Sequence, residues 1–213
     1  RRMINADQIM EYIEKKITRG EIILLNADTN PAVIEAIPRI ADFVRDIGYD
    51  FTTISDLYKG QYEVKSFEEI PNHDAIKINY YLPDTPPRFI EKIPNNENKV
   101  FITFDDWGGD KVITKILDVL EEKNVKATFF LRAAGVENNV NLAKAISEGG
   151  HDVASHTYSH TDIIELSKEA LQEDLYKAHK VITEAIQRCP ELFMRPPRLY
   201  KDDEHMRAVK AMG

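Results

Sequence analysis

The stretch that decides the fold is KVFITFDDWGGDKVITKILDVLEEKNVKATFFL, residues 99–131. It opens with a β-rich run at Lys99–Asp105, continues with apolar residues at helical spacing after Asp110, and ends in a second apolar run at Ala127–Leu131. A strand, a helix and a strand in this order predict two parallel strands joined by a crossover helix. Parallel sheets and barrels bind ligands at the carboxyl ends of their strands, so the residues that follow each run are candidates for a functional site.

The same alternation continues to the last residue. We expect a helix at 141–148, a third strand at His151–Ser155, a long helix capped by Ser167, a fourth strand at Leu192–Arg195 and a final helix that runs to Gly213. The spacing of strands and helices predicts an α/β fold with a parallel sheet or barrel over residues 99–213.

The first half of the chain divides into two parts. Residues 1–60 predict helices and strands again, with a strand at Glu21–Asn26, a helix that Pro38 kinks or breaks, and a further strand at Phe51–Ile54. Residues 61–98 lose this pattern and hold five of the ten prolines, which is typical of a linker or a long surface connection.

Length, net charge, apolar stretches and cysteine count exclude several classes of protein. A chain of 213 residues can bury a sizeable core, and its net charge of −8 argues against nucleic acid as a partner. No stretch approaches the roughly 20 apolar residues that span a membrane. No signal peptide is visible after Arg1 and Arg2, although this says little about where the protein works. The single cysteine, Cys189, excludes a disulfide scaffold or a cysteine-rich zinc site within this chain.

An acidic pair follows the first strand. Asp105 and Asp106 would repel each other in one cleft unless a cation lay between them. One carboxylate can bind a metal while the other accepts a proton from water. The simpler interpretation is a turn and capping cluster that leads to Asp110. Trp107 comes next, and either a sugar-stacking wall or packing of the loop would explain it.

Two histidines follow the third strand. His156 and His160 stand four residues apart, and on a helical turn this spacing brings both imidazoles to one face, ready for a single ion. Such pairs are common by chance, but no other two of the six histidines have helical spacing. Two histidines and one aspartate leave positions open for water and substrate, as in catalytic metal sites.

Arg195-Pro196-Pro197 ends the fourth predicted strand. The prolines fix an extended backbone, and an arginine held there can bind a carboxylate through its planar fork. We expect Arg195 to pair with Asp105; a strand-end arginine that faces solvent is the alternative.

Together these strings resemble the polysaccharide deacetylases of carbohydrate esterase family four, the NodB homology domain. The family motifs T-F-D-D, H-[S/T]-x-x-H and R-P-P are matched by Thr103–Asp106, His156–His160 and Arg195–Pro197. The resemblance covers residues 99–213 and implies a distorted (β/α) barrel. It implies a divalent metal, Zn²⁺ or similar, on Asp106, His156 and His160.

The resemblance also implies roles and a setting. Asp105 would be the base and Arg195 its orienting partner, and the metal and a backbone N–H near Arg198 would hold the oxyanion. We expect Trp107, Pro197 and Arg198 to be the substrate contacts. The substrates implied are N-acetylated or O-acetylated sugars of a polysaccharide or oligosaccharide such as peptidoglycan or chitin. A cell-surface or extracellular setting is implied in the same way.

The chain departs from the family pattern in two places. Arg198-Leu199-Tyr200 stands where the family has an aromatic residue and glycine. Residues 1–60 resemble the C-terminal portion of such a barrel, with Asn26 where the family has its acid histidine. Either the chain is a slice of a tandem protein, with the N-terminal portion of a second barrel at 99–213, or the halves assemble into one barrel, within a chain or between two chains.

Three functions remain open. The first is a metal-dependent polysaccharide deacetylase, which the ligand trio and Asp105 favour. The second is a catalytically impaired carbohydrate-binding module of the same fold, favoured by Asn26 and the altered third motif. The third is a hydrolase of small amides or cyclic ureides, which a deep closed pocket would favour.

Overall fold

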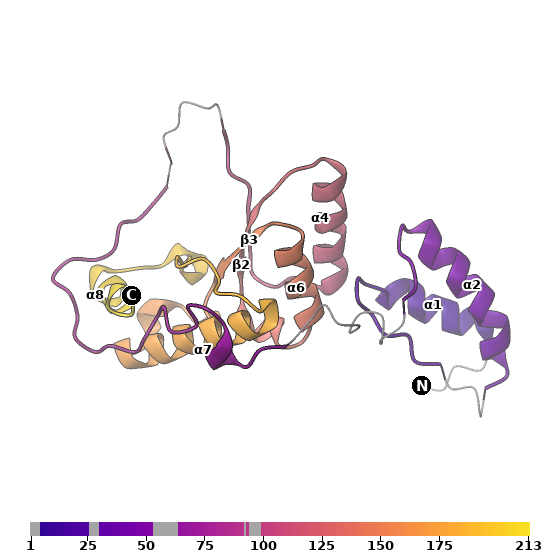
Figure 1. Ribbon diagram of the computed structural model, residues 1–213, viewed down its shortest axis with the longest axis horizontal. Helices are drawn as coiled ribbons and strands as arrows, with labels where there is room; N and C mark the ends of the chain where they lie inside the picture. Colours follow the sequence, from indigo (N-terminus) through magenta and orange to yellow (C-terminus); the bar gives the residue numbers. More distant parts are fainter. Residues whose placement is uncertain (1–4, 26–29, 53–63, 92, 94–98) are drawn as a thin grey trace. The chain divides into compact units, whose positions relative to one another are not determined.

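The computed structural model describes residues 5–25, 30–52, 64–91, 93 and 99–213. The chain forms two compact units, Arg1–Glu63 and Val64–Gly213 (Figure 1). Within the described residues, no helix has the length and apolar character required to cross a membrane.

The first unit is built on two helices, α1 (Ala6–Lys16) and α2 (Ala32–Asp46). The Asn5 side chain caps α1 by accepting a hydrogen bond from the Gln8 N–H at 2.9 Å. Each helix buries one apolar stripe, and the two stripes form a single core. The buried side chains include Ile9, Met10, Ile13, Val33, Ala36, Ile40 and Val44.

The predicted strands of this unit and a break at Pro38 are wrong, while a kink at Pro38 stays a prediction. Residues 21–25 form no strand, and residues 51 and 52 form none either; Asn26 and the remainder of the predicted strands lie outside the described residues. Pro38 does not break α2, which continues through it. Pro38 lies on the exposed side of the helix, so water can bind the carbonyl that loses its N–H partner.

The second unit contains a parallel sheet in the order β1 (Thr103–Asp105), β2 (Thr128–Leu131) and β3 (Asp152–Ser155). Its α/β class and parallel sheet confirm the prediction from the alternating pattern. The predicted fourth strand is reduced to one bridge between Ser155 and Met194, next to which the Arg195 N–H donates to the Ser155 carbonyl at 3.0 Å. Closure into a distorted barrel therefore stays a prediction.

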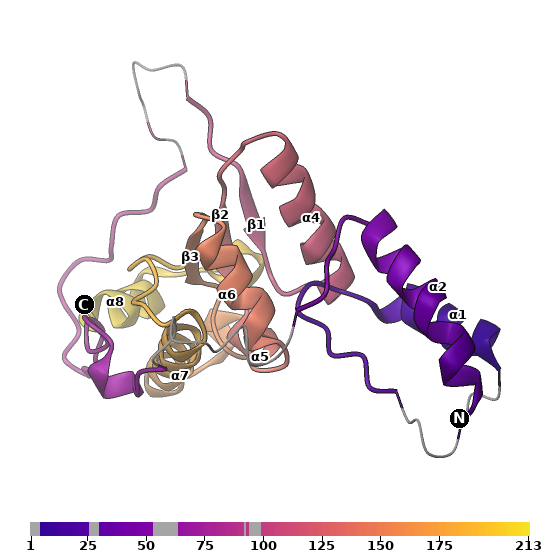
Figure 2. The ribbon, with the colours of Figure 1, turned by 45° about the vertical axis from the view of Figure 1, so that its right-hand side comes forward.

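Helices connect and cover the strands, and Figure 2 shows α4 and α6 alongside the sheet. Asp110 begins α4 and does not cap it, because its carboxylate accepts hydrogen bonds from the Trp107 and Asn139 side chains. The helices are α4 (Asp110–Glu122), α5 (Ala133–Val136), α6 (Val140–Glu148), α7 (Lys168–Ile186) and α8 (Asp203–Ala211), with 3₁₀ turns at Phe67–Glu69, Ile163–Glu165 and Pro197–Leu199.

Side chains of β2 alternate between two environments, as the period of a strand requires. Phe129 and Leu131 pack into the core with α4, α6 and α7. Phe130 points to the other face, where its ring lies 5.7 Å from that of Phe193. The helices therefore cover one face of the sheet, while the other face carries the residues discussed below.

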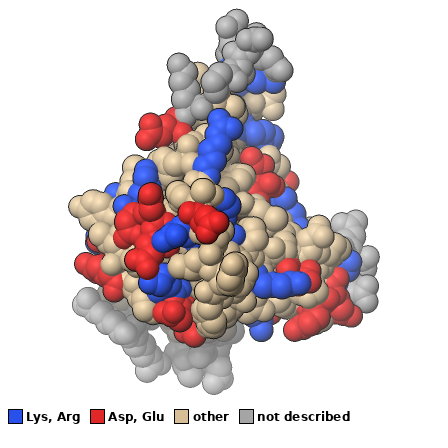
Figure 3. Space-filling model, turned by 90° about the vertical axis from the view of Figure 1, so that its left-hand side faces the viewer, with Lys and Arg blue, Asp and Glu red and all other residues tan. Residues whose placement is uncertain are grey.

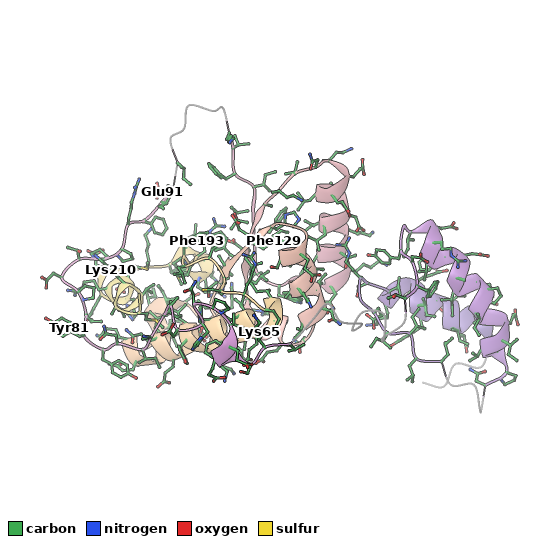
Figure 4. The ribbon with its side chains drawn as sticks, viewed as in Figure 1. Lys65, Tyr81, Glu91, Phe129, Phe193 and Lys210 are labelled. Carbon is green, nitrogen blue, oxygen red and sulfur yellow. The ribbon has the colours of Figure 1, made fainter. Side chains whose placement is uncertain are left out.

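Residues 64–82 run along α7 in the opposite direction, and we call them the α7 strap; Figure 4 marks Lys65 and Tyr81 near its two ends. Phe67 and Ile70 are buried. The side chains of two α7 residues and of its C-cap residue, Gln187, bond the strap backbone. These pairs are Gln187 with Lys65, His179 with His73, and Gln172 with Asn79. The stretch interpreted as a linker thus begins with a segment packed on the second unit; the other predicted domain boundaries stay predictions.

Charged side chains are spread over the face that Figure 3 presents. Acidic and basic groups lie interspersed there, so the net charge of −8 is not gathered in one patch on this face.

Candidate metal centre

The acidic pair lies at the carboxyl end of β1. Phe104 stacks on Phe129 at 4.9 Å and faces the helices, so Thr103 and Asp105 face the opposite side of the sheet. Asp106 follows the strand with a φ of 72°, a left-handed conformation that non-glycine residues adopt rarely. This turn separates the two carboxylates, so that each meets different partners.

His156 comes directly after β3 and is buried. Its Nδ1 lies 2.8 Å from the Arg195 carbonyl, which can only accept, so Nδ1 carries the proton and Nε2 keeps a lone pair. Burial lowers the pKa of His156, against the opposing effects of the Arg195 hydrogen bond and the charges of Asp105 and Asp106. The side chain is therefore a neutral imidazole with Nε2 available as a ligand.

The loop from His156 to His160 is not the helical turn that its spacing predicted. Thr157 and His160 have φ values of 65° and 64°, and the Thr157 hydroxyl accepts a hydrogen bond from the His160 N–H at 3.1 Å. The Ser155 hydroxyl accepts from the Thr157 N–H at 3.2 Å. These bonds from short polar side chains replace helical hydrogen bonds. The imidazoles still converge, with ring centroids 5.0 Å apart.

Asp106, His156 and His160 form one cluster, as predicted. Their ligand atoms all lie within 4.8 Å of one another. Asp106 Oδ1 is 3.0 Å from His160 Nε2 and 3.8 Å from His156 Nε2. Two imidazole nitrogens and one carboxylate oxygen suit Zn²⁺ and leave further positions of a tetrahedral shell open. The residues therefore fit a divalent ion.

Asp105 pairs with Arg195, as the sequence predicted. Arg195 Nη1 lies 2.5 Å from Asp105 Oδ1 and 3.0 Å from Thr103 Oγ1. The guanidinium stacks over the Phe130 ring at 4.0 Å from its centroid, which fixes its plane. The face of the sheet opposite the helices thus holds an oriented carboxylate near the three-residue cluster.

The structure places the three predicted substrate contacts in different surroundings. Trp107 belongs to the buried core, where a Cβ added to Gly135 would lie 2.2 Å from its Cγ. The loop-packing interpretation is therefore the better one, and a sugar-stacking wall at Trp107 is not supported. Pro197 is buried as well. Arg198 is exposed, but its guanidinium forms an ion pair with the Asp162 carboxylate.

The sequence did not predict two acidic residues near the cluster. Asp162 is buried and holds Arg198. Asp174 lies on α7 and accepts hydrogen bonds from the Tyr158 and Ser159 N–H groups. Neither belongs to a recognisable motif, and an acidic residue on a helix is usually solvent-exposed. Only the folded structure shows that Asp162 contacts Arg198 and that Asp174 contacts the backbone of residues 158 and 159.

The fold and the cluster define an α/β protein with a candidate metal centre at the carboxyl ends of parallel strands. The chain belongs to the polysaccharide deacetylase family, whose sequence model matches residues 92–213. A peptidoglycan-N-acetylglucosamine deacetylase of Bacillus cereus is 30% identical over 164 residues, which are 72% of this chain and 58% of that protein. The chain thus spans little more than half of this curated relative.

Solved structures give a similar result. A peptidoglycan N-acetylglucosamine deacetylase in complex with a naphthalenyl benzamide is 32% identical, with a TM-score of 0.52 over 55% of each chain. A pseudoenzyme of carbohydrate esterase family four from Bacillus anthracis is 29% identical, with a TM-score of 0.51 over 55% of this chain and 42% of that one. The chain therefore resembles both an enzyme and a pseudoenzyme of the family.

Proposed function

We propose that the second unit is a metal-dependent hydrolase that removes N-acetyl or O-acetyl groups from a polysaccharide such as peptidoglycan or chitin. The observation that carries the proposal is the cluster of Asp106, His156 and His160 beside an Asp105 carboxylate that Arg195 orients. The name of the Bacillus cereus relative favours peptidoglycan as the substrate, and with it a cell-surface or extracellular setting.

Different residues of the chain have different roles in the proposed reaction. A divalent ion such as Zn²⁺, held by Asp106, His156 and His160, would supply the Lewis acid that activates water and polarises a carbonyl. Asp105 accepts a proton from the attacking water. Arg195 binds Oδ1 of Asp105 and so orients the carboxylate, which leaves Oδ2 as the proton acceptor.

The leaving amine needs a proton from another group. Asn26 stands where the family pattern has a histidine, and an asparagine side chain cannot deliver a proton. Loss of a general acid typically lowers turnover by about 10²–10⁴-fold.

Acetate release tests the proposal. The full chain is incubated with acetylated chitooligosaccharides and with peptidoglycan, with and without a metal chelator. We expect release that the chelator abolishes and added Zn²⁺ restores. Release that ignores the chelator, or no release under any condition, would contradict the proposal.

A catalytically impaired carbohydrate-binding module is the second candidate. The likeness to a pseudoenzyme and the engagement of Arg198 by Asp162 favour it. This function predicts glycan binding that D105A leaves unchanged, together with no acetate release from any acetylated glycan. Equilibrium binding of chitooligosaccharides, measured on the same protein as acetate release, separates the two functions.

A further inference from the structure

The backbone that carries His160 adopts a costly conformation. Thr157 and His160, two of the five residues from 156 to 160, lie in the left-handed region. Non-glycine residues adopt this conformation rarely, and it persists only where surrounding structure enforces it. The position of the His160 ring relative to Asp106 therefore depends on what holds this loop.

Two consecutive N–H groups at the apex of the loop point at one carboxylate. Asp174 Oδ2 accepts from the Tyr158 N–H at 2.7 Å, and Asp174 Oδ1 accepts from the Ser159 N–H at 3.1 Å. Each oxygen takes one donor, so the carboxylate fits the turn as an anion fits a nest of backbone amides. Hydrogen bonds to an ionised acceptor are about twice as strong as neutral ones.

The helix that carries Asp174 is a rigid base. Its neighbours Gln172 and Leu175 are buried, and Gln172 bonds both the α7 strap and the carbonyl of Ala208. The Asp174 side chain is thus anchored on an element packed on two sides. It touches the backbone of residues 158 and 159 and none of the three cluster side chains.

We propose that Asp174 is a positioning residue for the metal centre, which holds the left-handed loop so that His160 Nε2 meets Asp106 and His156 at one ion. The inference rests on the proposed metal site. Asp174→Asn tests it, because the amide is isosteric but offers one acceptor oxygen, while its NH₂ group confronts an N–H donor.

The matched control is Glu173→Gln. Glu173 is exposed, stands one residue away on the same helix, and loses the same charge. Zn²⁺ affinity is measured by competition with a chelating dye, and exchange of the amides in residues 156–160 is measured by mass spectrometry on the metal-free protein. We expect D174N to weaken Zn²⁺ binding by about 10–100-fold, as loss of outer-shell partners does, and to speed exchange in this loop. E173Q should match the wild type in both measurements.

Several outcomes would overturn the inference. Equal Zn²⁺ affinity of D174N and the wild type would do so, as would equal losses in D174N and E173Q. A D174N protein that fails to fold without metal would also do so, because the inference confines the effect to the loop. A wild type that binds no Zn²⁺ contradicts the proposed function instead, and the exchange measurement then still tests whether Asp174 holds the loop.

Discussion

The two ends of β3 each carry a buried histidine, and these side chains are set up in opposite ways. His151 precedes the strand, and its Nδ1 accepts a hydrogen bond from the Ala127 N–H at 3.2 Å. His156 follows the strand, and its Nδ1 donates to the Arg195 carbonyl at 2.8 Å. The proton of the neutral ring therefore sits on Nε2 in His151 and on Nδ1 in His156.

The side chains around His151 and His156 also differ. Burial lowers the pKa of both histidines. The charge of Lys126 lowers the pKa of His151 further and that of Asp152 raises it, while Asp105 and Asp106 both raise the pKa of His156. His151 is enclosed by Phe129, whose ring it meets edge-on at 5.4 Å. Burial alone therefore does not predict a metal ligand. His156 differs from His151 in that its unprotonated ring nitrogen, Nε2, lies 3.8 Å from Asp106 Oδ1 at the carboxyl end of β3.

The largest expected effect extends this comparison to the acids at the two ends of the sheet. Asp105→Asn removes the proposed base and should lower the turnover number for acetate release by about 10²–10⁴-fold, with Zn²⁺ affinity retained. Asp152→Asn, an exposed acid at the amino end of β3, is the control and should leave turnover unchanged. Equal losses in both variants would remove the distinction between the two ends.

A second prediction compares the two histidines directly. His156→Gln should weaken Zn²⁺ binding by more than about 100-fold, because loss of a ligand costs more than loss of an outer-shell partner. His151→Gln keeps an acceptor for the Ala127 N–H and should bind Zn²⁺ as the wild type does. Dye competition measures both constants, and a loss in H151Q that equals the loss in H156Q would break the comparison.

A third prediction concerns how Asp105 is oriented. Arg195→Lys keeps the charge but cannot bond Thr103 and Asp105 while stacking on Phe130. Losing about one hydrogen bond to a charged group, roughly 1.5 kcal/mol, should reduce turnover about tenfold. Since Arg195 acts through Asp105, R195K should have little further effect in D105N. Additive losses in the double variant would mean that Arg195 acts on its own.

The smallest expected effect is on how the free energy of unfolding depends on pH. The pKa of His151 in the folded protein is below its ordinary value of 6.5, so the unfolded chain binds more protons between these two values. The free energy of unfolding of the metal-free protein should therefore fall as pH drops through this window. H151Q should make the slope shallower, by at most about 1.4 kcal/mol per pH unit. Denaturant titrations from pH 7.5 to 5 measure it, and parallel curves for both proteins would contradict the neutral, buried state of His151.

The sequence predicted the strand and helix alternation of residues 99–213 because periodic apolar residues report burial directly. The α7 strap has no periodicity, and side chains 93 to 122 residues away bond its backbone. His179 is buried and its Nε2 lies 2.8 Å from the His73 carbonyl of the strap, a contact that no local pattern shows.

The candidate site was predictable as a set of residues but not as a geometry. The aspartates, histidines and Arg195 meet because parallel strands end at one edge of the sheet. The left-handed conformations of Asp106 and His160 are backbone geometries that the residue types do not predict, and Asp174 reaches the Tyr158 N–H from 16 residues along the chain. Trp107 was ambiguous because an aromatic side chain after a strand serves packing as well as sugar binding.

Anomalous scattering at the zinc edge, from crystals of the full chain grown with Zn²⁺, tests the central claim most directly. The account predicts one strong peak about 2.0–2.2 Å from an Asp106 carboxylate oxygen, His156 Nε2 and His160 Nε2. Zinc bound elsewhere on the protein with this cluster empty, or zinc held by fewer than these three side chains, would contradict it.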